Sequence, residues 1–162
     1  MKTLLLLRHA KSGWDDPALK DFERPLNKRG LKAAHAIGIF LRQQKVQPQL
    51  ILSSPAERAR QTTLLVMESA KLTVDLRYDE RIYEASPERL IEVLSQIEDA
   101  ADVVLLVGHN PGFEELSERL TGEAHRMPTA ALACLNLNLE KWSKVKEDCA
   151  RLEWLVKPGD LL

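Results

Sequence analysis

Two histidines and two arginines lie where apolar runs of the sequence end. Arg8 and His9 directly follow the apolar run 3–7, which has the composition of a buried strand. His109 follows a second apolar run, and Arg58 lies where a third, shorter run turns into a helical pattern. Because ligands of open α/β sheets bind at the carboxyl ends of strands, we expect these four side chains to meet at one edge of a sheet.

The combination of two arginines with two histidines suits a phosphoryl group. A guanidinium is planar, always charged and able to bind two phosphate oxygens at once, so Arg8 and Arg58 can stabilise the charge of a phosphoryl group in transfer. His9 can then act as a nucleophile, provided that its other ring nitrogen donates to a backbone carbonyl in residues 9–13. We expect His109 to be the protonated partner that completes the anion pocket.

Each of these side chains also has a purely structural explanation. A histidine at a strand end is often only a hydrogen-bonded structural residue, and Arg58 taken alone is typical of a solvated helix or an ion pair. His35 lies inside an apolar helical pattern and is interpreted as structural. The hypothesis of a site therefore rests on the joint occurrence of His, Arg and His at three strand ends.

The rest of the sequence alternates between strand and helix patterns. Strands are predicted at residues 3–7, 50–53, 74–77, 102–107, 131–139 and 150–156, the fifth with one solvated face. Helices are predicted over 28–44 and after Ser54, Ser86 and Asn110. Ser54 and Glu57 are expected to form a capping box at the second helix. This alternation indicates a three-layer α/β/α sandwich with a mostly parallel sheet and an antiparallel edge, and it leaves 9–27 as a long loop of the functional kind.

Composition and charge narrow the function classes. The 162 residues carry 23 basic and 24 acidic side chains, a net charge of −1, and no block of like charges, so we expect no nucleic-acid partner and no membrane partner. Arg8 interrupts the apolar start too early for a signal peptide, and no segment is long enough to span a membrane, which predicts a cytoplasmic protein. Cys134 and Cys149 are predicted to be free thiols; no metal and no cofactor are expected.

Several segments resemble the histidine phosphatase superfamily, the relatives of phosphoglycerate mutase. The family's Arg-His-Gly motif appears as Arg8-His9-Ala10, and its Ser-Ser-Pro-x-x-Arg-Ala-x-Gln-Thr segment appears at 53–62. Residues 107–110 are similar to the family's second-histidine motif, and 24–30 to the segment that opens its first helix. The resemblance implies a phosphoglycerate mutase-like fold over one domain, residues 1–162.

The resemblance also implies a role for each site residue. His9 is the nucleophile that becomes a phosphohistidine, while Arg8, Arg58 and His109 bind the phosphate. Ser12 is a further expected contact with the phosphate. Ala10 stands where the family usually has glycine, which limits positive φ at that position.

The acid/base group and one departure from the family concern carboxylates. Residues 79–83 resemble the mutase segment Asn-Glu-Arg-His-Tyr, whose glutamate is the proton donor, and this indicates Glu80, with Asp79 and Glu84 as alternatives. Asp15 stands where mutases carry a phosphate-binding asparagine. A carboxylate repels phosphate unless it is protonated or turned away, so the phosphate-binding role is not extended to Asp15.

Only 28 residues separate Glu80 from His109, and one predicted helix fills them. Mutases and many small-molecule phosphatases carry insertions here that cover the site, so this chain is most similar to the SixA-type phosphohistidine phosphatases. We therefore expect an open pocket and metal-independent hydrolysis of protein phosphohistidine through a phosphohistidine enzyme intermediate. A small-molecule phosphomonoesterase on the same scaffold and a non-catalytic phosphate-binding module are the alternatives. The sequence leaves the oligomeric state open, a monomer included.

Overall fold

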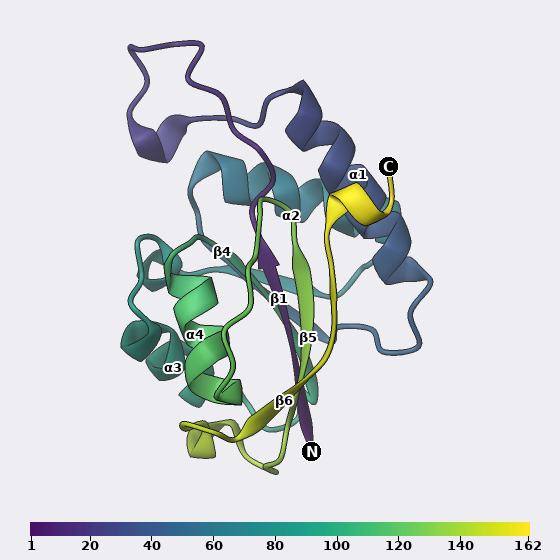
Figure 1. Ribbon diagram of the computed structural model, residues 1–162, viewed down its shortest axis with the longest axis vertical. Coiled ribbons are helices and arrows are strands. Elements are labelled where there is room, and N and C mark those ends of the chain that lie inside the picture. The colour runs from purple at the N-terminus through teal and green to yellow at the C-terminus, as the bar shows by residue number, and fades with distance from the viewer.

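The central strands of the sheet come from the most apolar segments of the chain. The computed structural model describes all of residues 1–162 and contains a six-stranded sheet in the order β3-β2-β4-β1-β5-β6 (Figure 1). The strands are β1 (Lys2–Arg8), β2 (Leu50–Ser53), β3 (Asp75–Tyr78), β4 (Val103–Gly108), β5 (Leu132–Leu137) and β6 (Ala150–Val156). Strands β1 to β4 run parallel, β5 is antiparallel to β1, and β6 is antiparallel to β5. The mostly parallel sheet is confirmed, with its reversed strand one position in from the edge.

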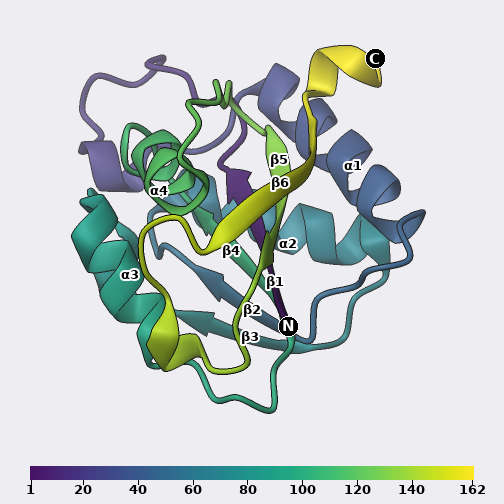
Figure 2. The same ribbon diagram turned by 60° about the horizontal axis from the view of Figure 1, so that its bottom comes forward.

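Helices cover both faces of the sheet and complete the expected three layers (Figure 2). They are α1 (Lys28–Arg42), α2 (Glu57–Ala70), α3 (Pro87–Ser95) and α4 (Gly112–Thr121). Leu5 and Leu7 of β1 belong to the core under α1 and α2, whereas Leu4 and Leu6 belong to the core under α3 and α4. These four consecutive leucines are fully buried because neither face of the sheet is open to water.

The lengths and compositions of the helices also bear on membrane insertion. None of the four has the length and apolarity that crossing a bilayer requires.

The strand register brings the two site histidines to neighbouring positions. Arg8 pairs with Gly108 across β1 and β4, and the backbone N–H of His9 donates to the Gly108 carbonyl at 2.9 Å. On the other side of β4, Ser53 pairs with Val107. Strands β1, β4 and β2 therefore end side by side, so the residues that follow them share one edge of the sheet.

The expected capping box at α2 is wrong. The helix begins at Glu57, and its N-cap residue, Ala56, makes no side-chain cap. The Glu57 carboxylate accepts a hydrogen bond from Arg60 at 2.8 Å instead. Ser54 lies two residues before the N-cap, where its hydroxyl accepts from the backbone N–H of Ala56 at 3.2 Å and lies 2.7 Å from Nε2 of His109.

The solvated face expected for the strand at 131–139 is also wrong over most of its length. Cys134 is only 2% exposed and belongs to the core under α1 and α2, while Leu135 belongs to the opposite core. The prediction relied on the alternation of Leu and Asn. In the structure β6 pairs along one edge of β5, and both faces of β5 are packed in the cores except around Asn136, which is partly exposed. Cys134 and Cys149 are free thiols, as predicted.

Candidate active site

Two buried imidazole rings form the centre of the candidate site. His9 follows β1 and His109 follows β4, and each is 7% exposed. Their ring centroids lie 5.1 Å apart, with 52° between the ring planes. The side chains that the sequence analysis derived from two separate strand ends are therefore neighbours in space.

The His9 ring is held in one orientation by its own backbone neighbourhood. Its Nδ1 lies 2.7 Å from the carbonyl oxygen of Ala10. Because a carbonyl can only accept, Nδ1 donates and carries the proton, which leaves the lone pair on Nε2. That nitrogen faces Nε of Arg58 at 3.4 Å. The carbonyl partner expected within residues 9–13 is thus Ala10.

Burial keeps both histidines neutral. It lowers the pKa of His9 to about 4, against the opposing effect of the Ala10 hydrogen bond and with help from the charge of Arg58. Burial also lowers the pKa of His109 to about 3, and the neighbouring His9 and Arg58 act in the same direction. The expectation of a protonated His109 is therefore wrong for the free protein. A bound phosphate dianion would raise the pKa of His109 again.

This arrangement predicts a loss of stability in weak acid. In the unfolded chain both histidines titrate near 6.5, so between about pH 6.5 and pH 4 the unfolded state binds protons that the folded state does not. The free energy of unfolding should fall as the pH drops, by up to about 1.4 kcal/mol per pH unit for each histidine. Urea unfolding at about pH 7 and about pH 5 measures this. A variant with glutamine at both His9 and His109 should lose less over the same interval, and an equal loss would contradict the assignment.

Two polar groups of the site are buried without a hydrogen-bond partner. They are Nε of Arg8 and Nδ1 of His109, and no other buried side-chain nitrogen or oxygen in the structure lacks a partner. Nη1 of Arg8 donates to the Met127 carbonyl at 3.1 Å. Both atoms belong to residues that we expect to bind phosphate, and a nitrogen of this kind can donate a hydrogen bond to an anion.

The other predicted residues make no hydrogen bond to the two histidines. Glu80 is exposed at the start of a 3-10 turn, and its side chain makes no hydrogen bond to the pocket. The Asp79 carboxylate accepts from the backbone N–H of Arg81 at 2.9 Å, so it caps this turn. Ser12 donates its hydroxyl to the Pro25 carbonyl at 2.8 Å. The roles of Glu80 and Ser12 stay predictions.

Sequence reasoning missed two groups that contact the site. Asp21, in the long loop, accepts hydrogen bonds from Arg58 at 3.0 Å and from the Tyr83 hydroxyl at 2.5 Å. The ring of Tyr83 packs edge-on against that of His109, with centroids 5.4 Å apart. No local sequence pattern predicts these contacts, because Asp21 lies 37 residues from Arg58 and 62 residues from Tyr83 in the sequence.

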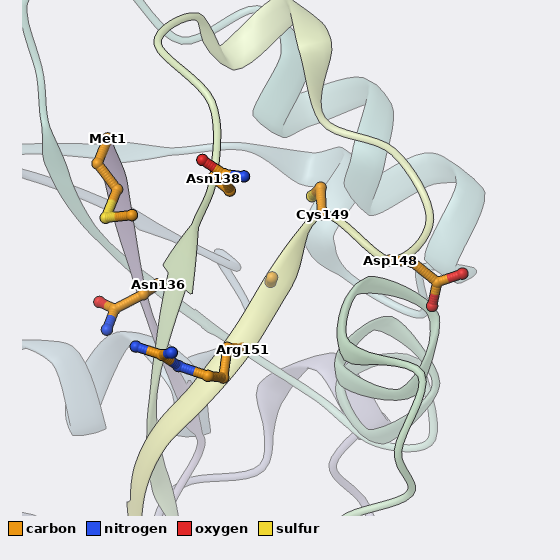
Figure 3. A pocket seen from close by; sticks show the side chains of 7 residues that line it. Met1, Asn136, Asn138, Asp148, Cys149 and Arg151 are labelled. Carbon is orange, nitrogen blue, oxygen red and sulfur yellow. The ribbon is translucent and has the colours of Figure 1, made fainter.

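A second hollow lies at the other end of β1, away from the histidines (Figure 3). It is lined by Met1, Asn136, Asn138, Asp148, Cys149, Ala150 and Arg151. Figure 3 shows amide and carboxylate groups around it, and its lining includes neither a histidine nor a pair of arginines.

Comparisons with known proteins agree with this geometry. Residues 4–99 match the family model of the histidine phosphatase superfamily (branch 1). An uncharacterized protein of Mycobacterium tuberculosis is 32% identical over 160 residues, which is 90% of this chain and 96% of the relative. A chloroplastic, uncharacterized protein of Arabidopsis thaliana is 30% identical over 152 residues, 88% of this chain and 70% of the relative.

Solved structures show the same fold over nearly the whole chain. A candidate phosphohistidine phosphatase SixA from Agrobacterium tumefaciens superposes with a TM-score of 0.84 at 32% identity, covering 97% of this chain and 98% of that one. The protein histidine phosphatase SixA in complex with tungstate superposes with a TM-score of 0.85 at 24% identity, covering 99% of each chain.

Proposed function

Because the chain belongs to branch 1 of the histidine phosphatase superfamily, we propose that this phosphatase hydrolyses phosphohistidine on other proteins, with His9 as its nucleophile. One observation carries the proposal. The proton of the His9 ring is fixed on Nδ1 by the Ala10 carbonyl, and the free Nε2 faces the Arg58 guanidinium at 3.4 Å. A nucleophile and a phosphate-binding group, both largely buried, thus lie side by side.

The reaction has two steps. His9 Nε2 attacks phosphorus, a bond forms between them, and the bond from phosphorus to the substrate nitrogen breaks, so the electron pair leaves with the substrate imidazole. Water then attacks the phosphoryl group on His9, and the nitrogen–phosphorus bond breaks to release phosphate. Arg8, Arg58 and His109 hold the phosphoryl oxygens throughout, and the Nδ1–H bond to Ala10 stabilises the charge on the phosphorylated ring.

Glu80 is the proposed acid/base group of both steps. It would protonate the leaving nitrogen in the first step and accept a proton from water in the second. Its position after β3 supports this role, since the turn that begins at Glu80 leads directly to Tyr83 beside His109.

The short segment between Glu80 and His109 supports a protein substrate. The segment between Glu80 and His109 forms α3, which packs against α4 beside the sheet (Figure 2). A pocket without a covering insertion can receive a phosphorylated side chain that projects from a folded surface, whereas small ligands are usually buried over most of their area. The 32% identical Agrobacterium tumefaciens protein, a candidate phosphohistidine phosphatase, supports the same substrate class. That the protein acts in the cytoplasm stays a prediction.

Phosphate release from several substrates tests the proposal. A histidine-phosphorylated protein, a sugar phosphate and p-nitrophenyl phosphate are compared in the presence of EDTA. We expect the highest kcat/KM for the phosphohistidine protein, with no loss of rate caused by EDTA. A preference for the sugar phosphate would indicate a small-molecule phosphomonoesterase. Binding of orthovanadate without phosphate release from any substrate would indicate a phosphate-binding module instead.

A further inference from the structure

One carboxylate holds the guanidinium of Arg58 from the side opposite the nucleophile. Nη1 of Arg58 donates to the backbone carbonyl of Asp21 at 2.7 Å, and Nη2 donates to the Asp21 carboxylate at 3.0 Å. The remaining donor, Nε, faces Nε2 of His9 at 3.4 Å. Arg58 is 6% exposed, so its guanidinium makes these contacts largely shielded from solvent.

We propose that Asp21 is a positioning residue of the phosphatase site, which fixes the Arg58 guanidinium with its Nε edge toward His9. The inference rests on the proposed function. A guanidinium is a rigid plane whose donors lie in a fixed fork, so two bonds to one residue at the Nη end determine where the Nε edge points. A phosphoryl group bonded to Nε2 of His9 would place its oxygens within reach of that edge.

Asp21 can do this because it is itself restrained. The Tyr83 hydroxyl donates to its carboxylate at 2.5 Å, and Arg24 lies 3.2 Å from the other carboxylate oxygen. Although partial burial raises the pKa of Asp21, the hydrogen bonds from Tyr83 and Arg58 lower it below its ordinary value overall, so the carboxylate is charged at neutral pH. Phe22 packs edge-on against Tyr83 with ring centroids 5.1 Å apart, which anchors the same turn of the loop.

The contact also explains how a long loop outside the sheet takes part in the site. Arginine has several rotatable bonds, so holding its side chain in one geometry costs conformational entropy. Hydrogen bonds to fixed partners offset that cost. The strand ends supply His9, whereas the loop supplies both Asp21 bonds that orient Arg58, and Tyr83 restrains Asp21 in turn. Loss of Asp21 should therefore leave the charged guanidinium of Arg58 in the site but no longer fix its orientation toward His9.

A double-mutant cycle tests this. Asp21→Ala, Arg58→Ala and the double variant are compared with the wild type for kcat on a histidine-phosphorylated protein. We expect Asp21→Ala to lower kcat about 10- to 100-fold, the loss that a misplaced group of this kind causes, and to have no further effect in the Arg58→Ala background. Asp21→Asn, which keeps an acceptor oxygen, should recover part of the rate. Additive losses would overturn the proposal, because they would show that Asp21 acts without Arg58.

Asp16→Ala is the matched control, because Asp16 lies exposed in the same loop and its carboxylate accepts only from the backbone of Ala18, at 3.0 Å. It should keep the wild-type kcat. A loss equal to that of Asp21→Ala would overturn the proposal, since any change in the loop would then suffice.

Orthovanadate affinity separates this proposal from the proposed function. If the wild type releases no phosphate from any substrate, the proposed function fails, but the same four proteins can still be titrated with orthovanadate. We expect weaker binding by Asp21→Ala and no additional weakening in the Arg58→Ala background. Additive losses of affinity, or a wild type that does not bind orthovanadate, would overturn the positioning role.

Discussion

Replacing His9 with alanine should reduce phosphate release to the uncatalysed rate. The reason is that no other group can take its place. The second buried histidine, His109, follows a different strand and lacks the arrangement of His9: its Nε2 lies 2.7 Å from the Ser54 hydroxyl, and its Nδ1 has no carbonyl partner that would fix the ring proton. Without Nε2 of His9 there is no lone pair beside Arg58 and no covalent intermediate.

Two measurements decide this prediction. The first is the rate of phosphate release from a histidine-phosphorylated protein by wild type and His9→Ala. The second is the detection of a phosphoenzyme that is labile in acid and stable in base, which should form in wild type only. His35→Ala is the matched control, since His35 is exposed on α1, and it should behave as wild type. Turnover by His9→Ala at more than a few per cent of the wild-type rate would exclude His9 as the nucleophile.

Replacing Arg58 with alanine should cost about 10² to 10³ in kcat, the usual consequence of removing one preorganised donor to a developing oxyanion. Arg58 is almost fully buried, and its Nε lies 3.4 Å from the attacking nitrogen. Its contribution should therefore be made at the transition state, where the phosphoryl oxygens carry most charge, and KM should change less than kcat.

Two further variants show whether the fork or only the charge of Arg58 is needed. Arg58→Lys keeps a positive charge without the planar pair of donors, so it should fall between wild type and Arg58→Ala. Arg60→Ala removes an arginine from the same helix that pairs with Glu57 at 2.8 Å on the surface, and it should leave kcat unchanged. A fully active Arg58→Lys would contradict the geometric role, and an inactive Arg60→Ala would point to a defect of the helix.

The parts of the molecule that follow from local pattern were predictable from the sequence. An apolar run that ends in a polar residue marks a strand end, and the edge rule for parallel sheets then brings His9, Arg58 and His109 together. The start of α3 was equally clear, because the Ser86 side chain accepts from the backbone of Arg89 as an N-cap should.

What the sequence could not show depends on distant contacts. The neutral state of His109 follows from its burial, and burial follows from packing that no single motif describes. Ser54 was expected to cap a helix, but its hydroxyl contacts His109. This contact forms only when the chain folds, so the sequence around Ser54 does not show it. The contact of Asp21 with Tyr83 joins two loops whose sequences carry no sign of each other.

The register of β1 and β4 has a consequence for protein engineering. Neighbouring strands in any sheet lie about 4.8 Å apart, and the two histidine rings, one residue beyond paired strand ends, lie 5.1 Å apart. Main-chain pairing therefore brings the two histidines to adjacent positions, and the contacts of the rings with Ala10 and Ser54 set their orientations. The loop that reaches the pocket is tied down at its base by the bridge between Ser12 and Leu26. The stretch between those two anchors could be exchanged for a foreign sequence to retarget the enzyme only if Asp21 is retained, because Asp21 holds the Arg58 guanidinium beside His9.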